Sequence, residues 1–289
     1  MQAKGKLYLV ATPIGNLGDI TLRALETLRQ VDLIAAEDTR RTRHLLAYYG
    51  ITTPTCSLHA HNEQAKTAAL IAQLLRGSSL ALVSDAGTPL VNDPGFPLVA
   101  AAHQAGIQVV PLPGPCAAIA ALTASGLPAD RFAFEGFLPR TQSARLAHLK
   151  RLRDEPRTLV FYESSHRLEA CLKDLAAVFP PARRLVIAKE LTKLNERLIS
   201  TSVAEAPELF RRQPEWKKGE FVLVLEGAPP PARAELTLEQ LRTLEVLLAE
   251  CSLRTAVALA EKLTGAPRKT LYRAALASQG RSAKAETSP

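Results

Sequence analysis

Short apolar runs alternate with amphipathic segments along the first part of the chain. The apolar runs, which predict strands, lie at 7–11, 31–36, 55–58, 79–84 and 107–112. Segments with apolar residues at helical spacing lie at 21–30, 39–49, 63–76, 96–104 and 116–124. Repeated strand–helix units of this length favour a parallel sheet with helices on both faces.

The pattern changes beyond residue 126. Strands are predicted at 132–134, 158–161, 185–189, 197–201 and 221–225, and helices at 142–153, 165–179 and 203–212. The closely spaced runs 185–189 and 197–201 indicate a mixed sheet. A proline run at 229–231 then precedes three helical patterns, at 237–249, 253–263 and 267–277. The sequence thus predicts an α/β fold in three parts: an N-terminal α/β domain (1–125), a second α/β domain with a mixed sheet (126–228) and a C-terminal helical module (229–289).

The loop after the apolar run 79–84 is the most informative segment of the chain. It reads Ser-Asp-Ala-Gly-Thr-Pro at 84–89 and continues to Asp93-Pro94-Gly95. Open α/β sheets bind ligands at the carboxyl ends of their strands. The loop holds two aspartates and no lysine, so it suits a neutral or cationic ligand better than a polyphosphate. A second proline-rich loop, 113–116, is expected to face it across one crevice.

Common nucleotide and hydrolase motifs are absent from the sequence. It has no G-x-x-x-x-G-K-[ST], no G-x-G-x-x-G after a strand and no G-x-S-x-G. P-loop NTPases, dinucleotide-binding enzymes and serine hydrolases of the nucleophile-elbow type are therefore disfavoured.

The net charge of +8 is distributed unevenly. Residues 1–127 carry +1, residues 128–227 carry +4 and residues 228–289 carry +3. A basic surface outside the ligand-binding domain favours a polyanionic macromolecular partner, although charge for solubility alone gives the same count. Arg268, Lys269 and Arg273 on the last helix are typical of a nucleic-acid-binding or docking module, and a structural cap is the alternative.

Membrane, disulfide and metal sites are not expected. No apolar stretch approaches the roughly 18 residues that a membrane span requires. The four cysteines are far apart and form no C-x-x-C pair, which predicts reduced thiols and a cytoplasmic location. His59 and His61 have metal-ligand spacing but no further cysteine or histidine nearby, so no metal is predicted.

Taken together, the loop motifs resemble the tetrapyrrole methylase superfamily. The matching segments lie at 7–19, 36–40, 84–89, 93–95, 113–117, 136–139, 161–164 and 189–193. They occur in order between about residues 6 and 226, and a weaker match continues at 268–273. The similarity is closer to the branch that methylates the 2′-hydroxyl of a cytidine ribose in 16S ribosomal RNA.

The resemblance implies two α/β domains with S-adenosylmethionine bound between them, usually in a homodimer that acts on 16S rRNA or the small ribosomal subunit. The cofactor-binding residues that it implies are Pro13, Ile14, Ser84, Asp85, Ala86, Gly87, Thr88, Pro89, Pro113, Gly114, Pro115, Cys116, Ala117, Tyr162 and Leu191. Cys116 departs from the serine that is commoner in the family. Loss of one hydroxyl hydrogen bond costs about 1 kcal/mol, so cofactor binding is expected to survive.

A ribose hydroxyl is a poor nucleophile, and a base or a charge that lowers its pKa assists its attack. The candidates for catalysis are Asp38, Arg40, Glu163 and Lys189, all at predicted strand ends, with Glu37 and Glu190 beside them. Arg40, Arg41 and Arg43, on one helical turn, fit phosphate contacts better than a catalytic set. The structural alternatives are a helix cap at Asp38 and an ion pair at Lys189.

Three other functions fit parts of the sequence. A corrin or porphyrin methylase fits the loops but leaves the basic excess and the C-terminal helices unexplained. A diphthine-forming protein methylase shares the fold but is not expected to have residues 84–89 in this form. A non-catalytic RNA-binding assembly factor would require the intact loops to be vestigial.

Overall fold

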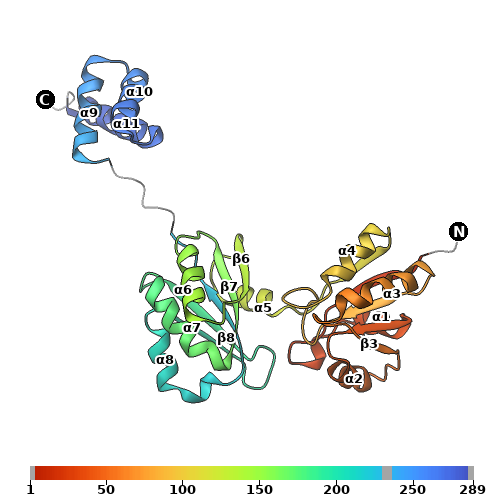
Figure 1. Cartoon of the computed structure of the whole chain (residues 1–289). Coiled ribbons are helices and arrows are strands. Elements are labelled where there is room, and N and C mark those ends of the chain that lie inside the picture. The colour runs from red at the N-terminus through yellow and green to blue at the C-terminus, as the bar shows by residue number, and fades with distance from the viewer. Residues whose placement is uncertain (1–3, 230–235, 286–289) are drawn as a thin grey trace. The chain divides into compact units, whose positions relative to one another are not determined.

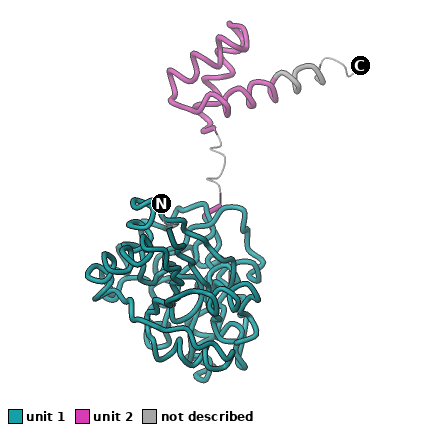
Figure 2. Tube along the Cα trace, turned by 90° about the vertical axis from the view of Figure 1, so that its right-hand side faces the viewer, with its two compact units in different colours: residues 1–227 teal, residues 228–289 magenta. Residues whose placement is uncertain are grey.

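The computed structural model describes residues 4–229 and 236–285. Contacts within the chain divide it into two compact units, unit 1 (residues 1–227) and unit 2 (residues 228–289), shown in Figure 2. Two prolines of the predicted linker, Pro230 and Pro231, lie outside the described residues. The predicted domain limits after residues 125 and 228 stay predictions.

The first sheet of unit 1 has five parallel strands in the order β3-β2-β4-β1-β5. Its strands are β1 (Lys6–Val10), β2 (Leu33–Ala36), β3 (Thr55–Ser57), β4 (Leu80–Val83) and β5 (Gln108–Leu112). Since β1 lies between β4 and β5, and parallel strands end at the same edge, the loops that leave these three strands are neighbours. This edge of the sheet is where the candidate site lies.

Helices cover both faces of the first sheet (Figure 1). The apolar sides of α1 (Leu22–Gln30) and α2 (Thr39–Tyr48) bury one face, and α3 (Glu63–Leu75) and α4 (Phe96–Gln104) bury the other. A short 3₁₀ turn, η1 (Leu17–Asp19), precedes α1.

The second sheet of unit 1 is mixed, with the order β6-β7-β10-β8-β9. Its strands are β6 (Phe132–Phe137), β7 (Thr158–Ser164), β8 (Arg184–Lys189), β9 (Arg197–Ser202) and β10 (Glu220–Leu225). Strands β6 and β7 are parallel, and the other neighbours are antiparallel. Both β6 and β7 run three residues beyond their predicted ends, because strand pairing continues through the polar positions that interrupt the apolar pattern.

The two faces of the second sheet have different covers. One face packs against α6 (Gln142–Arg151), α7 (Ser165–Val178) and α8 (Ala206–Arg212), and a 3₁₀ turn, η2 (Pro214–Lys217), adds Trp216 to this core. The other face packs against α5 (Ala117–Ala124), the helix that follows β5 of the first sheet. The chain segment that leaves the first sheet therefore forms part of the core of the second.

Unit 2 is a small helical bundle with its own core. It consists of α9 (Leu238–Glu250), α10 (Leu253–Thr264) and α11 (Arg268–Ala285). Leu244, Val257 and Leu271, one from each helix, are buried together. The predicted fold class, two α/β domains with a parallel and a mixed sheet plus C-terminal helices, is confirmed. None of the helices in the described part of the chain is long and apolar enough to cross a membrane.

A buried ion pair connects α6 to α7 in the second domain. Arg145 and Asp174 are each 4% exposed in their side chains, and the Arg145 Nε lies 2.7 Å from Asp174 Oδ2. The Arg145 guanidinium also donates to the carbonyl oxygens of Pro139 and Arg140, after β6. This arginine thus fixes the loop that leaves β6.

Replacement of Asp174 by asparagine is expected to destabilise unit 1 by about 3–5 kcal/mol, because it leaves the Arg145 charge buried without its counter-ion. Chemical denaturation followed by circular dichroism measures the change. The matched control is Glu208→Gln, which removes an exposed pair with Arg211 and is expected to leave the denaturation midpoint unchanged. Equal midpoints for the wild type and Asp174→Asn would contradict the expectation.

Candidate active site

Three loops that leave neighbouring strands of the first sheet are bonded into one surface. Thr12, after β1, and Gly87, after β4, exchange two backbone hydrogen bonds of 2.9 Å each. The hydroxyl of Thr88 donates to the carbonyl oxygen of Pro115, after β5, at 2.9 Å. A Cβ on Gly114 would lie 2.8 Å from the Cβ of Ala11, so only glycine permits this approach. The loops expected to face one crevice are therefore in contact.

A cavity of about 410 Å³ lies over these loops and reaches the second sheet. The first domain contributes Ile14, Glu37, Arg41, Asp85, Ala86, Gly87, Thr88, Val91, Asn92, Asp93, Cys116 and Ala117 to its lining. The second domain contributes Phe137, Tyr162, Glu163, Ser164, Ala188, Leu191, Glu220, Phe221 and Val222. Its size falls in the range of small-ligand sites, which is about 300–1,000 Å³.

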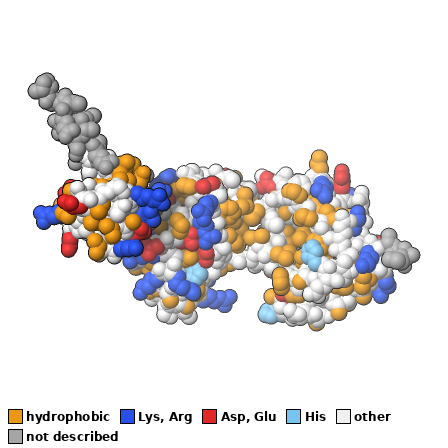
Figure 3. Space-filling view, turned by 90° about the horizontal axis from the view of Figure 1, so that it is seen from above, with side chains coloured by type: hydrophobic (Ala, Val, Ile, Leu, Met, Phe, Trp, Pro, Cys, Tyr) orange, Lys and Arg blue, Asp and Glu red, His pale blue; other side chains and the backbone are white. Residues whose placement is uncertain are grey.

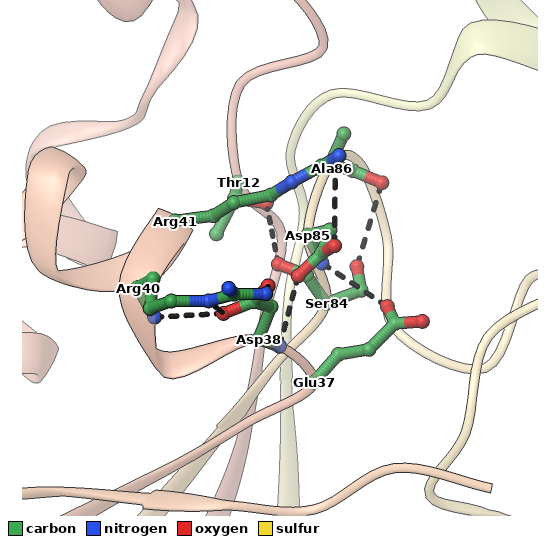
Figure 4. Close-up of polar contacts among 8 residues, drawn as sticks. All are labelled: Thr12, Glu37, Asp38, Arg40, Arg41, Ser84, Asp85 and Ala86. Atoms are coloured by element: carbon green, nitrogen blue, oxygen red, sulfur yellow. Dashed lines mark hydrogen bonds and ion pairs between the residues drawn. The ribbon is translucent and has the colours of Figure 1, made fainter.

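The carboxylate of Asp85 is fixed at the wall of this cavity (Figure 4). Its Oδ1 accepts a hydrogen bond of 2.9 Å from the backbone N–H of Asp38, and its Oδ2 lies 3.4 Å from the Arg41 guanidinium. Its own backbone N–H donates to Glu37 Oε2 at 3.3 Å. The loop after β4 and the start of α2 therefore hold each other in place.

Burial and mutual repulsion change the ionisation of two carboxyl groups in the cavity. Burial, together with the nearby charges of Glu37 and Asp85, raises the pKa of Asp93 to about 6, although a hydrogen bond from Ser84 opposes the shift. Burial also raises the pKa of Glu37, and the negative charge of Asp85 adds to this increase. Of the lining side chains only Arg41 is basic, so acidic groups dominate the cavity.

The second domain contributes an aromatic group and a buried carboxylate. The Tyr162 hydroxyl accepts a hydrogen bond of 3.2 Å from the backbone N–H of Ala118, and burial raises the pKa of this phenol well above its ordinary value. Glu163 accepts a hydrogen bond from the backbone N–H of Ser164 at Oε1, which also lies 3.4 Å from Arg167 Nε. Its Oε2 is buried and has no hydrogen-bond partner among the described residues. The Glu163 side chain is fully buried and lies opposite Phe221, on the face of the second sheet that packs against α7, so its carboxylate points away from the cavity.

The structure brings most of the expected cofactor-binding residues to the cavity. Those that line it are Ile14, Asp85, Ala86, Gly87, Thr88, Cys116, Ala117, Tyr162 and Leu191. The others flank them in the same loops without lining the cavity, and they are Pro13, Ser84, Pro89, Pro113, Gly114 and Pro115. Their contribution is to the shape of the loops, as the close approach at Gly114 illustrates.

Of the four catalytic candidates, only Glu163 is a lining residue, and its fully buried side chain points away from the cavity. Asp38 instead caps α2 and pairs with Arg40 at 2.7 Å in an exposed contact. Lys189 is 5% exposed and is not a lining residue. Side chains alternate along a strand, and Ala188 faces the cavity and α5, so Lys189 points to the opposite face. Asp38, Arg40 and Lys189 thus do not line the cavity, and the catalytic roles expected of them stay predictions.

Several other lining residues lie beside the predicted site residues. Sequence reasoning noted Glu37 beside the candidate Asp38, Arg41 as a phosphate contact and Asp93 as a charge in the loop. Two residues near Asp93 have left-handed backbone conformations, Leu90 with φ 71° and Asn92 with φ 66°. Phe137 lies in the matching segment 136–139, but its direction, like the position of Glu220, depends on the pairing of the second sheet.

A methyltransferase family model matches most of the chain. The model of the tetrapyrrole (corrin/porphyrin) methylases matches residues 6–207, and a model described as the RsmI C-terminal HTH domain matches residues 234–279.

Curated relatives match nearly the full chain. A protein of Escherichia coli O157:H7 is 52% identical over 278 residues, which cover 96% of this chain and 97% of that protein. A protein of Xylella fastidiosa (strain Temecula1) is 51% identical over 272 residues, which cover 94% and 99%. Both are named ribosomal RNA small subunit methyltransferase I.

A solved structure shares the fold. It is uroporphyrin-III C-methyltransferase of Thermus thermophilus complexed with S-adenyl homocysteine, with a TM-score of 0.52 and 20% identity. The match covers 77% of this chain and 97% of that one. The chain therefore belongs to the tetrapyrrole methylase family, whose methyl donor is S-adenosylmethionine.

Proposed function

We propose that this protein transfers a methyl group from S-adenosylmethionine to the 2′-hydroxyl of a cytidine in small-subunit ribosomal RNA. One observation carries the proposal. Relatives that are about half identical over more than nine-tenths of both chains bear the name ribosomal RNA small subunit methyltransferase I. The cytidine and its 2′-oxygen follow from the resemblance of the loop motifs, as does the expectation of a homodimer in the cytoplasm.

The cavity fits a sulfonium nucleoside in size and charge. Asp85 and Asp93 place carboxylates on its wall. S-Adenosylmethionine carries a positive sulfonium that the demethylated product lacks. An acidic wall therefore favours the methyl donor over the product.

The side chains of the cavity assist the acceptor hydroxyl. When bound, S-adenosylmethionine supplies an electrophilic methyl group whose leaving group is a neutral thioether. The hydroxyl loses its proton as its oxygen attacks, and a carboxylate with a pKa near the working pH accepts that proton efficiently. Asp93, whose pKa is about 6, meets this condition on the cavity wall.

Unit 2 and the second domain supply positive charge for RNA. Arg268, Lys269 and Arg273 follow one another near the start of α11, in the segment matched by the HTH model. Figure 3 shows one face on which basic side chains are interspersed with acidic and apolar ones. Such a surface supports contacts to individual phosphates rather than one continuous basic field.

A small-molecule methylase is the weaker candidate. The solved corrin and porphyrin methylases share the fold with this chain, and the match extends over about three-quarters of it. The segment 234–279 has its own match, to a domain of the ribosomal RNA enzymes.

Cofactor affinity is expected to fall as the pH falls through about 6. Asp93 is ionised above its raised pKa and attracts the sulfonium, and protonation below it removes that attraction. Calorimetric titration with S-adenosylmethionine between pH 5.5 and 8 should show this loss. Asp93→Asn should bind about tenfold more weakly at pH 8 and lose the pH dependence, since about 1.4 kcal/mol corresponds to tenfold. The exposed Asp19→Asn should behave as the wild type, and an unchanged profile in Asp93→Asn would refute the idea.

Removal of unit 2, residues 228–289, is expected to weaken RNA binding and spare cofactor binding. Loss of its phosphate contacts should lower the slope of log affinity against log salt concentration. Filter binding of small-subunit rRNA at several salt concentrations measures the slope, and calorimetry with S-adenosylmethionine is the control. Unchanged RNA affinity would assign unit 2 to a structural role.

The product of the reaction tests the proposal as a whole. Small-subunit rRNA from cells that lack the gene should lack one 2′-O-methylcytidine that is present when the gene is restored. Mass spectrometric mapping of nuclease fragments identifies the nucleotide and the methylated atom. A methyl group missing from a base instead would reject the 2′-hydroxyl as acceptor, and identical maps would reject the rRNA substrate.

A further inference from the structure

Phe137, the last residue of β6, is an exposed aromatic side chain on the cavity wall. It is 53% exposed, and it contacts Tyr162 edge to face, with ring centroids 5.7 Å apart. Of the large apolar side chains that are exposed in the described part of the chain, Phe137 is the one that lines this cavity. Exposure of an aromatic ring at a cavity rim costs solvation free energy unless a ligand covers it.

A β-bulge aims this ring at the cavity. The pairing of β6 with β7 shifts register between Phe134 and Gly136, so that Phe137 lies opposite Tyr162. If the register did not shift, Gly136 would lie opposite Tyr162, and Phe137 would point to the face covered by α7. Gly136 has φ 63°, which glycine adopts without strain. Bulges of this kind commonly redirect a side chain beside an active site.

The backbone after Phe137 is anchored on both sides. Leu138 is 2% exposed and packs in the core below the sheet. The Arg167 guanidinium donates to the carbonyl oxygens of Leu138 and Pro139, and the Arg145 guanidinium donates to Pro139 and Arg140. The backbone that carries the Phe137 ring is therefore held in place. Ligand binding then costs little conformational entropy of the protein at this position.

One positive charge lines the cavity, and a second follows Phe137 in the chain. Arg140 is exposed three residues beyond Phe137. In the first domain, Arg41 lines the same cavity with its side chain 69% exposed. An aromatic face with a guanidinium group in the same cavity suits an unstacked nucleotide, with its base on the ring and a phosphate on the arginine.

We propose that Phe137 is the stacking platform for the nucleobase of the nucleotide that receives the methyl group. This inference rests on the proposed function, because it assigns a subsite to the RNA substrate of the same cavity. Stacking holds the base at the rim and leaves the sugar free to enter between the two domains. An aromatic face accepts any base, so Phe137 provides affinity and position rather than base identity.

Steady-state kinetics with small ribosomal subunits from cells that lack the gene test the subsite. Phe137→Leu keeps an apolar side chain against Tyr162 but removes the aromatic face. It should raise the KM for the subunits about tenfold, as expected for loss of one base–aromatic stack, and leave the affinity for S-adenosylmethionine unchanged. Phe137→Tyr keeps the face and should stay within about threefold of the wild type.

Phe132, at the other end of β6, gives the matched control. It is 37% exposed and does not line the cavity, so Phe132→Leu should leave the KM unchanged. Thermal melting of each variant separates a folding defect from a binding defect. If Phe137→Leu instead weakens cofactor binding and spares the KM, the ring belongs to the cofactor site and the proposal is overturned.

A direct binding measurement avoids any dependence on turnover. The chain has one tryptophan, Trp216, which packs against Phe210 on the other side of the second sheet. In Phe137→Trp, oligocytidylate added with S-adenosylhomocysteine should quench the new fluorescence, and the wild type should show no quenching. Absence of quenching in a variant that still methylates subunits would reject the subsite and leave the proposed function intact. A wild type that methylates no rRNA would reject the proposed function itself.

Discussion

The reciprocal hydrogen bonds between Thr12 and Gly87 are the contact on which the candidate site depends. They join the loops that leave two adjacent parallel strands, and the Thr88 hydroxyl extends the connection to the loop after the third. Backbone groups satisfied in this way need no ligand to stay in place, so the floor of the cavity is formed in advance. Because these hydrogen bonds hold the loops in place, the loops can carry acidic, partly buried side chains and keep their conformation.

Charge is the second constraint on the cavity. Asp85 has both an arginine and a backbone N–H as partners, whereas Asp93 lies near the carboxylates of Glu37 and Asp85. Uncompensated negative charge in a partly buried site costs free energy unless a cation binds there. The arrangement is therefore understandable in a protein whose cofactor carries a sulfonium, and it links cofactor binding to the ionisation of Asp93.

The two faces of the second sheet have different roles, and one of them closes the cavity. Its helix-covered face holds the large apolar core and the buried Arg145–Asp174 pair. Its other face is shared by α5 and the cavity, and α5 arrives directly from the first sheet. Helix α5 begins where the loop after β5 ends, and it packs against the second sheet. The two α/β domains are therefore connected at the site itself.

The sequence alone determined the strand–helix alternation, the loops 84–89 and 113–117 and the family to which they belong. Those features are local, since a buried parallel strand followed by a glycine- and proline-rich turn has a recognisable pattern. Which side chains enter the cavity was decided by tertiary structure. Lys189 is turned away by the alternation of β8, and Phe137 is turned inward by a bulge that depends on pairing with β7. Register between strands distant in the chain sets both directions, and no local pattern encodes it.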